Sequence, residues 1–254
     1  MARATNFLAL NDPDPKEMSV VDHLDELRHR LIVCIITVSV FSVVGWFVAN
    51  PAFNLLAAPL NPYSHGPNPA ELVFGTLTSG FLIKIKIAVA IGIIIGLPVL
   101  LYEVWMFVAP AVSVDTRRYV VPFVSMGVIL FLVGIVVGYL VFPRVVQFLI
   151  IQGDSLPGSH QFLLQIDQYV AQFSLVVIIF GSVFELPVVL TFLAMIGVTS
   201  SRWLRSKRKY AAMIGLIGAM IITPGADPIT PFITGAVVYL LYEASILSVR
   251  LLHR

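Results

Sequence analysis

The chain is poor in charged residues and in cysteine, and each shortage excludes a class of protein. Only 12% of its 254 residues are charged while 58% are hydrophobic, which excludes a soluble domain and predicts an integral membrane protein. The formal net charge of +2 is too small to indicate nucleic acid as a partner. The single cysteine, Cys34, lies inside the first apolar run, so a disulfide and a cysteine metal site are both excluded and Cys34 is interpreted as a packing residue.

Residues that would indicate catalysis or cofactor binding are also missing. The five histidines lie outside the apolar stretches and on different sides of the expected membrane, so they do not converge on a metal. No Gly-rich phosphate loop, Gly-x-Ser-x-Gly or His-Glu-x-x-His pattern occurs. We therefore expect no cofactor, no metal and no enzyme.

What the chain does have is six apolar stretches, judged against the ~20 residues needed to cross ~30 Å of hydrocarbon. The fifth stretch is short, and the sixth is marginal. The pattern predicts an all-α polytopic membrane protein of one domain over residues 1–254, with a polar tail at 1–18. The expected spans are residues 31–48, 87–108, 119–142, 169–198, 210–222 and 232–249, with Asn50-Pro51 ending the first and Pro143 closing the third.

The distribution of lysine and arginine predicts the orientation of these spans. With six crossings, thirteen of the sixteen basic residues fall on the side that holds both termini, and only Lys84, Lys86 and Arg144 fall on the other. Such a bias is typical of a cytoplasmic side, so both termini are expected in the cytoplasm. The proline-rich segment 51–82 and the segment 143–168 then lie outside, where we expect short helices that cap the bundle.

The first span is preceded by a charged helical segment, Asp22 to Leu31, whose start is marked by a Ser19/Asp22 capping box. Glu26 and Arg30 have the i,i+4 spacing of an ion pair, and Arg28 falls at the edge of the apolar face. The segment fits a recognition surface on a membrane anchor. Spacing alone favours the plainer interpretation, a solvated helix end with scattered charges.

Four acidic residues lie in or beside the spans. Glu185 is near mid-depth of the fourth stretch, where an ionisable group costs at least ~2.5 kcal/mol, and this favours a functional role over a structural hydrogen bond. Glu103 and Glu243 are nearer the ends of their spans, where an interfacial structural role is equally compatible. Asp227 lies in a Pro/Gly turn between the last two stretches and also suits a plain turn.

An ordered set of motifs resembles the TatC family, the polytopic subunit of the twin-arginine (Sec-independent) protein translocase. The set comprises His23-Leu-Asp-Glu-Leu-Arg-His-Arg-Leu31, Tyr102-Glu-Val-Trp-Met-Phe-Val-Ala-Pro110, Arg117-Arg118 with Pro122, Phe184-Glu-Leu-Pro187, and Thr223-Pro224 with Asp227. The resemblance covers about residues 19 to 250. It implies a receptor that binds twin-arginine signal peptides of folded proteins at its cytoplasmic face and works with the proton-motive force.

The resemblance also implies partners and a location. The partners are single-span TatA- and TatB-type proteins, further copies of the chain itself and the lipid bilayer, with no nucleic acid. The location is a bacterial inner (plasma) membrane, with a thylakoid membrane as the alternative. A rival function is a proton-coupled small-solute transporter in which Glu185 carries the proton.

Site residues follow from the motif positions. Glu26 is the expected contact for the peptide's arginines, with Leu31 and Phe107 at matching positions. The family usually has glutamate directly before the arginine pair of the first cytoplasmic loop, whereas this chain has Asp115-Thr116-Arg117-Arg118. Asp115 is therefore the expected second carboxylate, with Glu103 as the other candidate. Arg28, Pro59 and Asp227 match positions for structure or assembly, and Glu185 matches the intramembrane glutamate.

Overall fold

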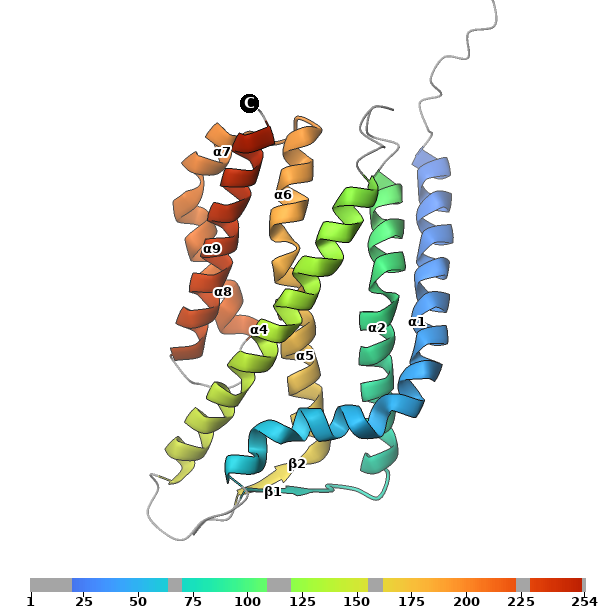
Figure 1. Ribbon diagram of the computed structural model, residues 1–254, viewed down its shortest axis with the longest axis vertical. Coiled ribbons are helices and arrows are strands. Elements are labelled where there is room, and N and C mark those ends of the chain that lie inside the picture. The colour runs from blue at the N-terminus through green and yellow to red at the C-terminus, as the bar shows by residue number, and fades with distance from the viewer. Residues whose placement is uncertain (1–19, 64–69, 109–119, 155–161, 223–228, 253–254) are drawn as a thin grey trace, which may run out of the picture.

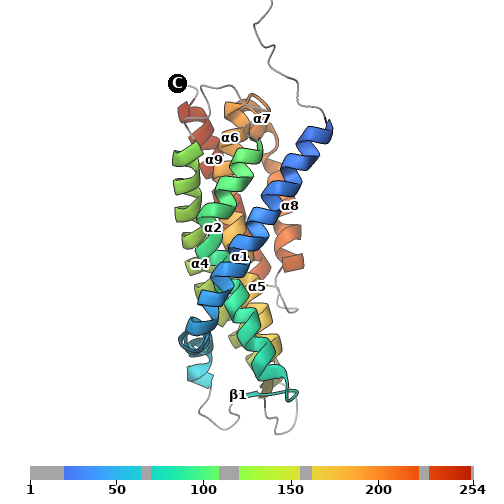
Figure 2. The same cartoon turned by 90° about the vertical axis from the view of Figure 1, so that its right-hand side faces the viewer.

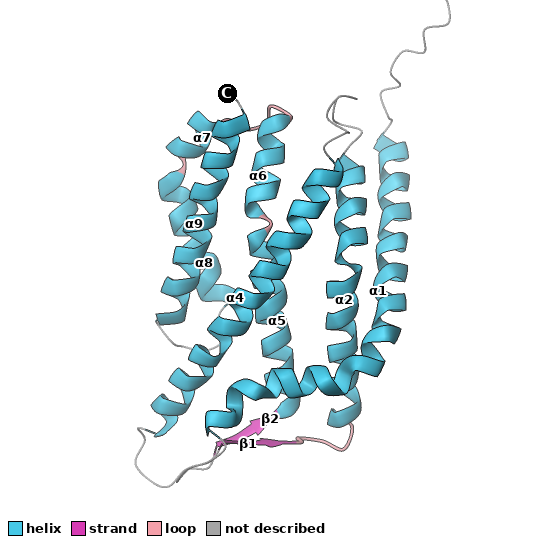
Figure 3. Ribbon diagram, in the orientation of Figure 1, coloured by secondary structure: helices cyan, strands magenta, loops and turns pink. Residues whose placement is uncertain are grey.

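The computed structural model is almost entirely helical (Figure 1, Figure 3). It describes residues 20–63, 70–108, 120–154, 162–222 and 229–252. The elements are α1 (Val20–Ala57), the 3₁₀ helix η1 (Ala58–Tyr63), β1 (Ala70–Val73), α2 (Ser79–Val108), α4 (Val120–Asp154), β2 (Phe162–Gln165), α5 (Ile166–Phe184), α6 (Leu186–Met195), α7 (Ser201–Ser206), α8 (Arg208–Ile222) and α9 (Ile229–Leu252).

Within the described residues, five helical segments are long and apolar enough to cross a membrane. They are Val21–Leu60, Ser79–Phe107, Val120–Gln152, Ile166–Met195 and Pro231–Leu251. The expected fifth span corresponds to α8, whose 15 residues extend only about 22 Å. The chain is thus a helical membrane protein with several apolar spans, and the six-span count stays a prediction.

Two prolines at expected span ends, Pro51 and Pro143, lie inside continuous helices. α1 continues through Pro51 to Ala57, and its last part turns sideways across the lower end of the bundle (Figure 1). α4 likewise passes through Pro143 and ends at Asp154. The helices therefore continue past both prolines, because an internal proline removes one hydrogen bond and bends a helix without having to end it. The limits of the membrane spans stay predictions.

The expected fourth span, 169–198, begins earlier and is divided. It starts with α5 at Ile166, breaks at Glu185, and continues as α6 to Met195. Pro187 lies in the first turn of α6, where its missing N–H costs nothing. The kink expected from Pro187 is therefore a break between two helices, and Glu185 is the residue at the break.

The lower end of the bundle in Figure 1 is covered by irregular elements. β1 and β2 pair in parallel, from Ala70 opposite Phe162 to Val73 opposite Gln165. The Tyr169 hydroxyl donates a hydrogen bond to the Leu56 carbonyl at 2.8 Å, which ties the sideways part of α1 to α5. Short helices were expected in this part of the chain, and the strand pair was not predicted.

The core surrounds α5, which packs against α4 and α2. Aromatic and branched side chains of α5 are buried with Phe142 of α4. Glycine allows the closest approach, because a Cβ on Gly134 would lie 2.6 Å from the Phe180 carbonyl oxygen. α1 contributes little to this core and leaves most of its apolar side chains exposed.

The first residue of α1 and the last turn of α9 lie at the same end of the bundle (Figures 1 and 2). The basic helix α7 and the end of α2 are at that end too.

Candidate functional site

The candidate site is built by the first turns of α1 and the last turns of α2, which run antiparallel beside each other (Figures 1 and 2). Glu26 and Arg30 are one turn apart on α1, and their predicted ion pair is confirmed. Arg30 donates to Glu26 Oε1 from Nε at 3.1 Å and from Nη2 at 2.5 Å. The helical spacing alone brings these two side chains together.

Arg30 also reaches across to α2. Its Nη1 donates to Glu103 Oε2 at 2.9 Å, so one guanidinium bridges carboxylates from two helices. The three side chains are only 14–19% exposed. Charge-assisted hydrogen bonds in so little water are stronger than surface ion pairs, and the bridge fixes the two glutamates near one point.

The site retains unused acceptor capacity. Glu26 Oε2 is buried and has no hydrogen-bond partner within the described residues. His23 Nδ1 lies 3.8 Å from this oxygen, which is too long for a hydrogen bond. A further N–H donor brought to this oxygen would therefore satisfy a buried group.

Phe107 lies one turn beyond Glu103 on the same face of α2. Its ring stacks on His23 with 4.4 Å between centroids and 12° between planes. The two helices thus meet twice, once through charge at Arg30 and Glu103 and once through aromatic rings. Phe107 thus lies beside the charged contact, and its role in peptide binding stays a prediction.

These groups surround an open cavity of about 580 Å³, which we call the carboxylate bowl. It is lined by Asp22, Asp25, Glu26, His29, Arg30 and Glu103. Four carboxylates face one guanidinium, which leaves three formal negative charges when the histidine is neutral. No cluster suited to a metal ion occurs among the described residues. The bowl can instead hold organic cations that donate several N–H groups.

Other predicted site residues lie elsewhere. Leu31 follows Arg30 in α1, is 57% exposed and is not among the residues that line the bowl. Arg28 is exposed and does not line the bowl. Pro59 is in η1, at the opposite end of the bundle. Asp115 and Asp227 lie outside the described residues.

Glu185 is the second acidic group that the structure leaves incompletely paired. It ends α5, and its Oε1 is buried without a hydrogen-bond partner in the part of the chain that is described. Gly127 of α4 and Leu101 of α2 lie beside the carboxylate, since a Cβ on Gly127 would be 2.9 Å from Glu185 Oε2 and 3.0 Å from Leu101 Cδ1. Glu185 therefore contributes to the three-helix contact and does not belong to the bowl.

Sequence reasoning missed Arg30 as the centre of the site. It paired Arg30 with Glu26 but treated Glu103 as a separate candidate. One signal was present: Glu103 and Phe107 are four residues apart, so both project from one face at the end of α2. That face meets α1, which local spacing could not reveal.

Comparisons with known proteins agree with one another. The family model described as Sec-independent protein translocase protein (TatC) matches residues 22–236. The chain is similar to the Sec-independent protein translocase proteins TatC of Desulforapulum autotrophicum, with 36% identity covering 90% of this chain and 83% of that one, and of Escherichia coli K12, with 32% identity covering 94% and 89%. It also resembles a solved structure titled twin arginine translocase receptor TatC, with a TM-score of 0.75, 34% identity and coverage of 91% of this chain and 100% of that one.

Proposed function

The chain belongs to the TatC family of Sec-independent protein translocase proteins, and we propose that its carboxylate bowl binds the paired arginines of twin-arginine signal peptides. Membership makes it a membrane protein-transport subunit and not an enzyme. The family assignment also favours protein translocation over solute transport through Glu185.

The contacts of Arg30 carry the proposal. One guanidinium is already held by carboxylates of two helices, so the site has the geometry that a guanidinium requires. Glu26 Oε2 remains available, and the residues that line the bowl carry a formal net charge of −3, from four carboxylates and one guanidinium. Two arginines would bring two positive charges and up to ten N–H donors to these acceptors.

Glu103 is the better supported second carboxylate. Its Oε2 and Glu26 Oε1 share Arg30, whereas Asp115 lies seven residues beyond the end of α2, outside the described residues. We propose that Glu26 and Glu103 form the bowl's base and that Asp115 contacts the peptide from the loop. Leu31, exposed beside the bowl, would contact apolar residues that follow the arginines.

The membrane arrangement that goes with this function has six spans and both termini in the cytoplasm. The bowl, the basic helix α7 and the end of α9 lie at one end of the bundle, which supports a cytoplasmic assignment for that end. α8 would cross as a span shorter than the ~30 Å hydrocarbon layer and thin the bilayer locally.

The remaining elements of the proposal concern assembly. The chain would act in a bacterial inner membrane with TatA- and TatB-type single-span partners and further copies of itself, driven by the proton-motive force. The exposed apolar surface of α1 supports contacts with other helices. We propose that Arg28, Pro59 and Asp227 have structural or assembly roles in the complex. Glu185 is proposed to act inside the membrane during translocation.

The test is binding of a labelled twin-arginine peptide to the purified chain. We expect Glu26→Gln and Glu103→Gln each to weaken binding at least tenfold, because each removes a charged acceptor. Glu243→Gln is the matched control, since Glu243 pairs with Arg208 near the same end but outside the bowl. A wild-type chain that binds a twin-lysine peptide as tightly as the twin-arginine peptide would refute the proposal.

A further inference from the structure

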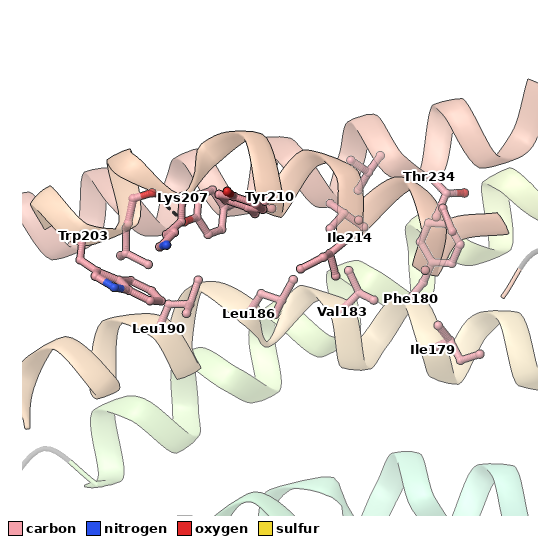
Figure 4. A pocket seen from close by; sticks show the side chains of 18 residues that line it. Ile179, Phe180, Val183, Leu186, Leu190, Trp203, Lys207, Tyr210, Ile214 and Thr234 are labelled. Atoms are coloured by element: carbon pink, nitrogen blue, oxygen red, sulfur yellow. Dashed lines mark hydrogen bonds between the residues drawn. The ribbon is translucent and has the colours of Figure 1, made fainter. Parts of the chain in front are cut away.

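A second cavity lies far from the carboxylate bowl, between the α5–α6 segment and the α8–α9 pair. It is an open groove of about 620 Å³, and its sides are almost entirely apolar. Figure 4 shows Leu186 and Leu190 on one side and Ile214 on the other, with Lys207 and Trp203 at one end and Thr234 at the opposite end. We call it the α6–α8 groove.

The groove exists because α8 presents glycine to it. A Cβ on Gly218 would meet nothing within 4 Å, so the space beside it is open. Gly215 has a different role, since a Cβ there would lie 3.0 Å from Val238 of α9 and loosen the packing of α8 on α9. One glycine thus holds α8 against α9 and the other leaves the groove unfilled.

The end of the groove near α7 is cationic. Lys207 lines the groove, and its Nζ lies 5.2 Å from the centroid of the Tyr210 ring. Arg208 is occupied by Glu243, but Lys207 has no ion-pair partner among the described residues. Arg205 and Lys209 are exposed close by in the chain. An apolar groove that ends at an unpaired ammonium group is complementary to an amphiphile with one anionic end.

We propose that the α6–α8 groove binds an anionic phospholipid, with the phosphate at Lys207 and one acyl chain lying along Leu186, Ile214 and Gly218. Basic pockets between membrane helices are typical sites for anionic head groups, and each nearby lysine adds about 1 kcal/mol of attraction. Trp203 supplies the amphipathic ring that is common at the head-group level. This inference is independent of signal-peptide binding.

The charge at one end of the groove favours a lipid over a partner helix as the occupant. Lys207 has no ion-pair partner among the described residues, and a lipid head group supplies an anion that the apolar side of a membrane-spanning helix lacks. An acyl chain is also thin enough to lie between the apolar walls.

The experiment uses the full chain with phospholipids that carry a photoreactive group in one acyl chain. We expect phosphatidylglycerol to label groove residues about fivefold more than phosphatidylcholine does, because both lipids carry a phosphate but only phosphatidylglycerol brings a net negative charge to the lysine. Lys207→Gln should bring that ratio close to one. Lys84→Gln is the matched control, because Lys84 also lies over an aromatic ring, Trp46, but at the opposite end of the bundle.

A second variant tests the position of the acyl chain. A Cβ added at Gly218 meets nothing within 4 Å, so Gly218→Leu should place its side chain in the open groove, and groove labelling should fall severalfold while the protein stays folded. Equal labelling by both lipids in the wild type, or unchanged labelling in Gly218→Leu, would overturn the proposal. Labelling that is absent in native membranes but appears after purification would also overturn it, in favour of a partner helix covering the groove.

Discussion

Glu103 and Glu185 are both glutamates in apolar helices, but their carboxylates have opposite surroundings. Glu103 shares the guanidinium of Arg30 with Glu26, so its charge is compensated by a neighbour. Glu185 ends α5 with one buried oxygen unpaired, and its neighbours are a glycine and a leucine. A buried carboxylate costs free energy unless a donor satisfies it.

The difference separates two uses of an acidic residue. The pair at Glu103 already has its complementary group, so a ligand at this site has to compete with or extend an existing set of hydrogen bonds. Glu185 has no such group within the described residues, and its free oxygen lies where α2, α4 and α5 meet. We therefore expect Glu103 to matter for stability and peptide affinity, and Glu185 to matter little for stability.

The sharpest test compares leucine substitutions at the two positions. Glu103→Leu should lower the free energy of unfolding by about 1–2 kcal/mol, because Arg30 loses one of its two charged acceptors in a mostly buried place. Glu185→Leu should change it by less than about 1 kcal/mol or raise it, because an incompletely bonded polar group is replaced by an apolar one of similar size. Unfolding in mixed detergent measures both, and the reverse order would contradict the comparison.

Arg30→Gln tests the competition at Glu103 directly. The substitution removes the internal guanidinium but keeps a side chain of similar length, so Glu26 and Glu103 become available to a ligand. Affinity for a twin-arginine peptide should rise roughly three- to tenfold, because the peptide no longer competes with Arg30 for the two carboxylates. Peptide titration measures it, and Arg208→Gln is the control because Arg208 pairs with Glu243 outside the bowl. A fall in affinity would mean that Arg30 instead holds the carboxylates in place.

The contacts of Arg30 with Glu26 and Glu103 show how far the sequence could predict the site. Hydropathy and charge distribution predicted a helical membrane protein, and helical spacing predicted the Glu26–Arg30 pair, because both are local properties. The bridge from Arg30 to Glu103 joins residues 73 apart in the chain, and it depends on how α1 packs against α2. Local spacing carries no information about that packing.

Proline positions show a further limit of local signals. Pro51 and Pro143 lie inside continuous helices, whereas Pro187 follows a real break at Glu185. The residue itself is identical in the three cases. A proline in the sequence therefore does not by itself tell whether a helix bends or breaks at that point. The paired strands β1 and β2 were missed for the same reason, since each is four residues long and stable only against the other.

Gly127→Ala tests the contact around Glu185 with a smaller expected effect. The added Cβ would press on Glu185 Oε2 and Leu101 Cδ1, which are both ends of flexible side chains, so the loss of stability should stay below about 1 kcal/mol. Combining Gly127→Ala with Glu185→Ala should restore the stability that Gly127→Ala loses, and the double-mutant cycle measures this coupling. Gly218→Ala is the control, because its Cβ meets open space. Additive effects would show that Glu185 does not lie against Gly127.

Phe107→Leu should have the smallest effect and tests whether the aromatic contact belongs to the charged site. Stacking on Phe107 fixes the His23 ring at the edge of the bowl, with Nδ1 3.8 Å from Glu26 Oε2. A leucine keeps the apolar contact but loses the flat stacking surface, so the ring is less restrained and twin-arginine peptide affinity should fall about two- to threefold, in line with ~0.5 kcal/mol for an aromatic pair. His23→Ala should produce a loss of similar size, and the double variant should lose no more than either single one, because both act through the same contact. Losses that multiply in the double variant would instead assign His23 and Phe107 separate contacts with the peptide.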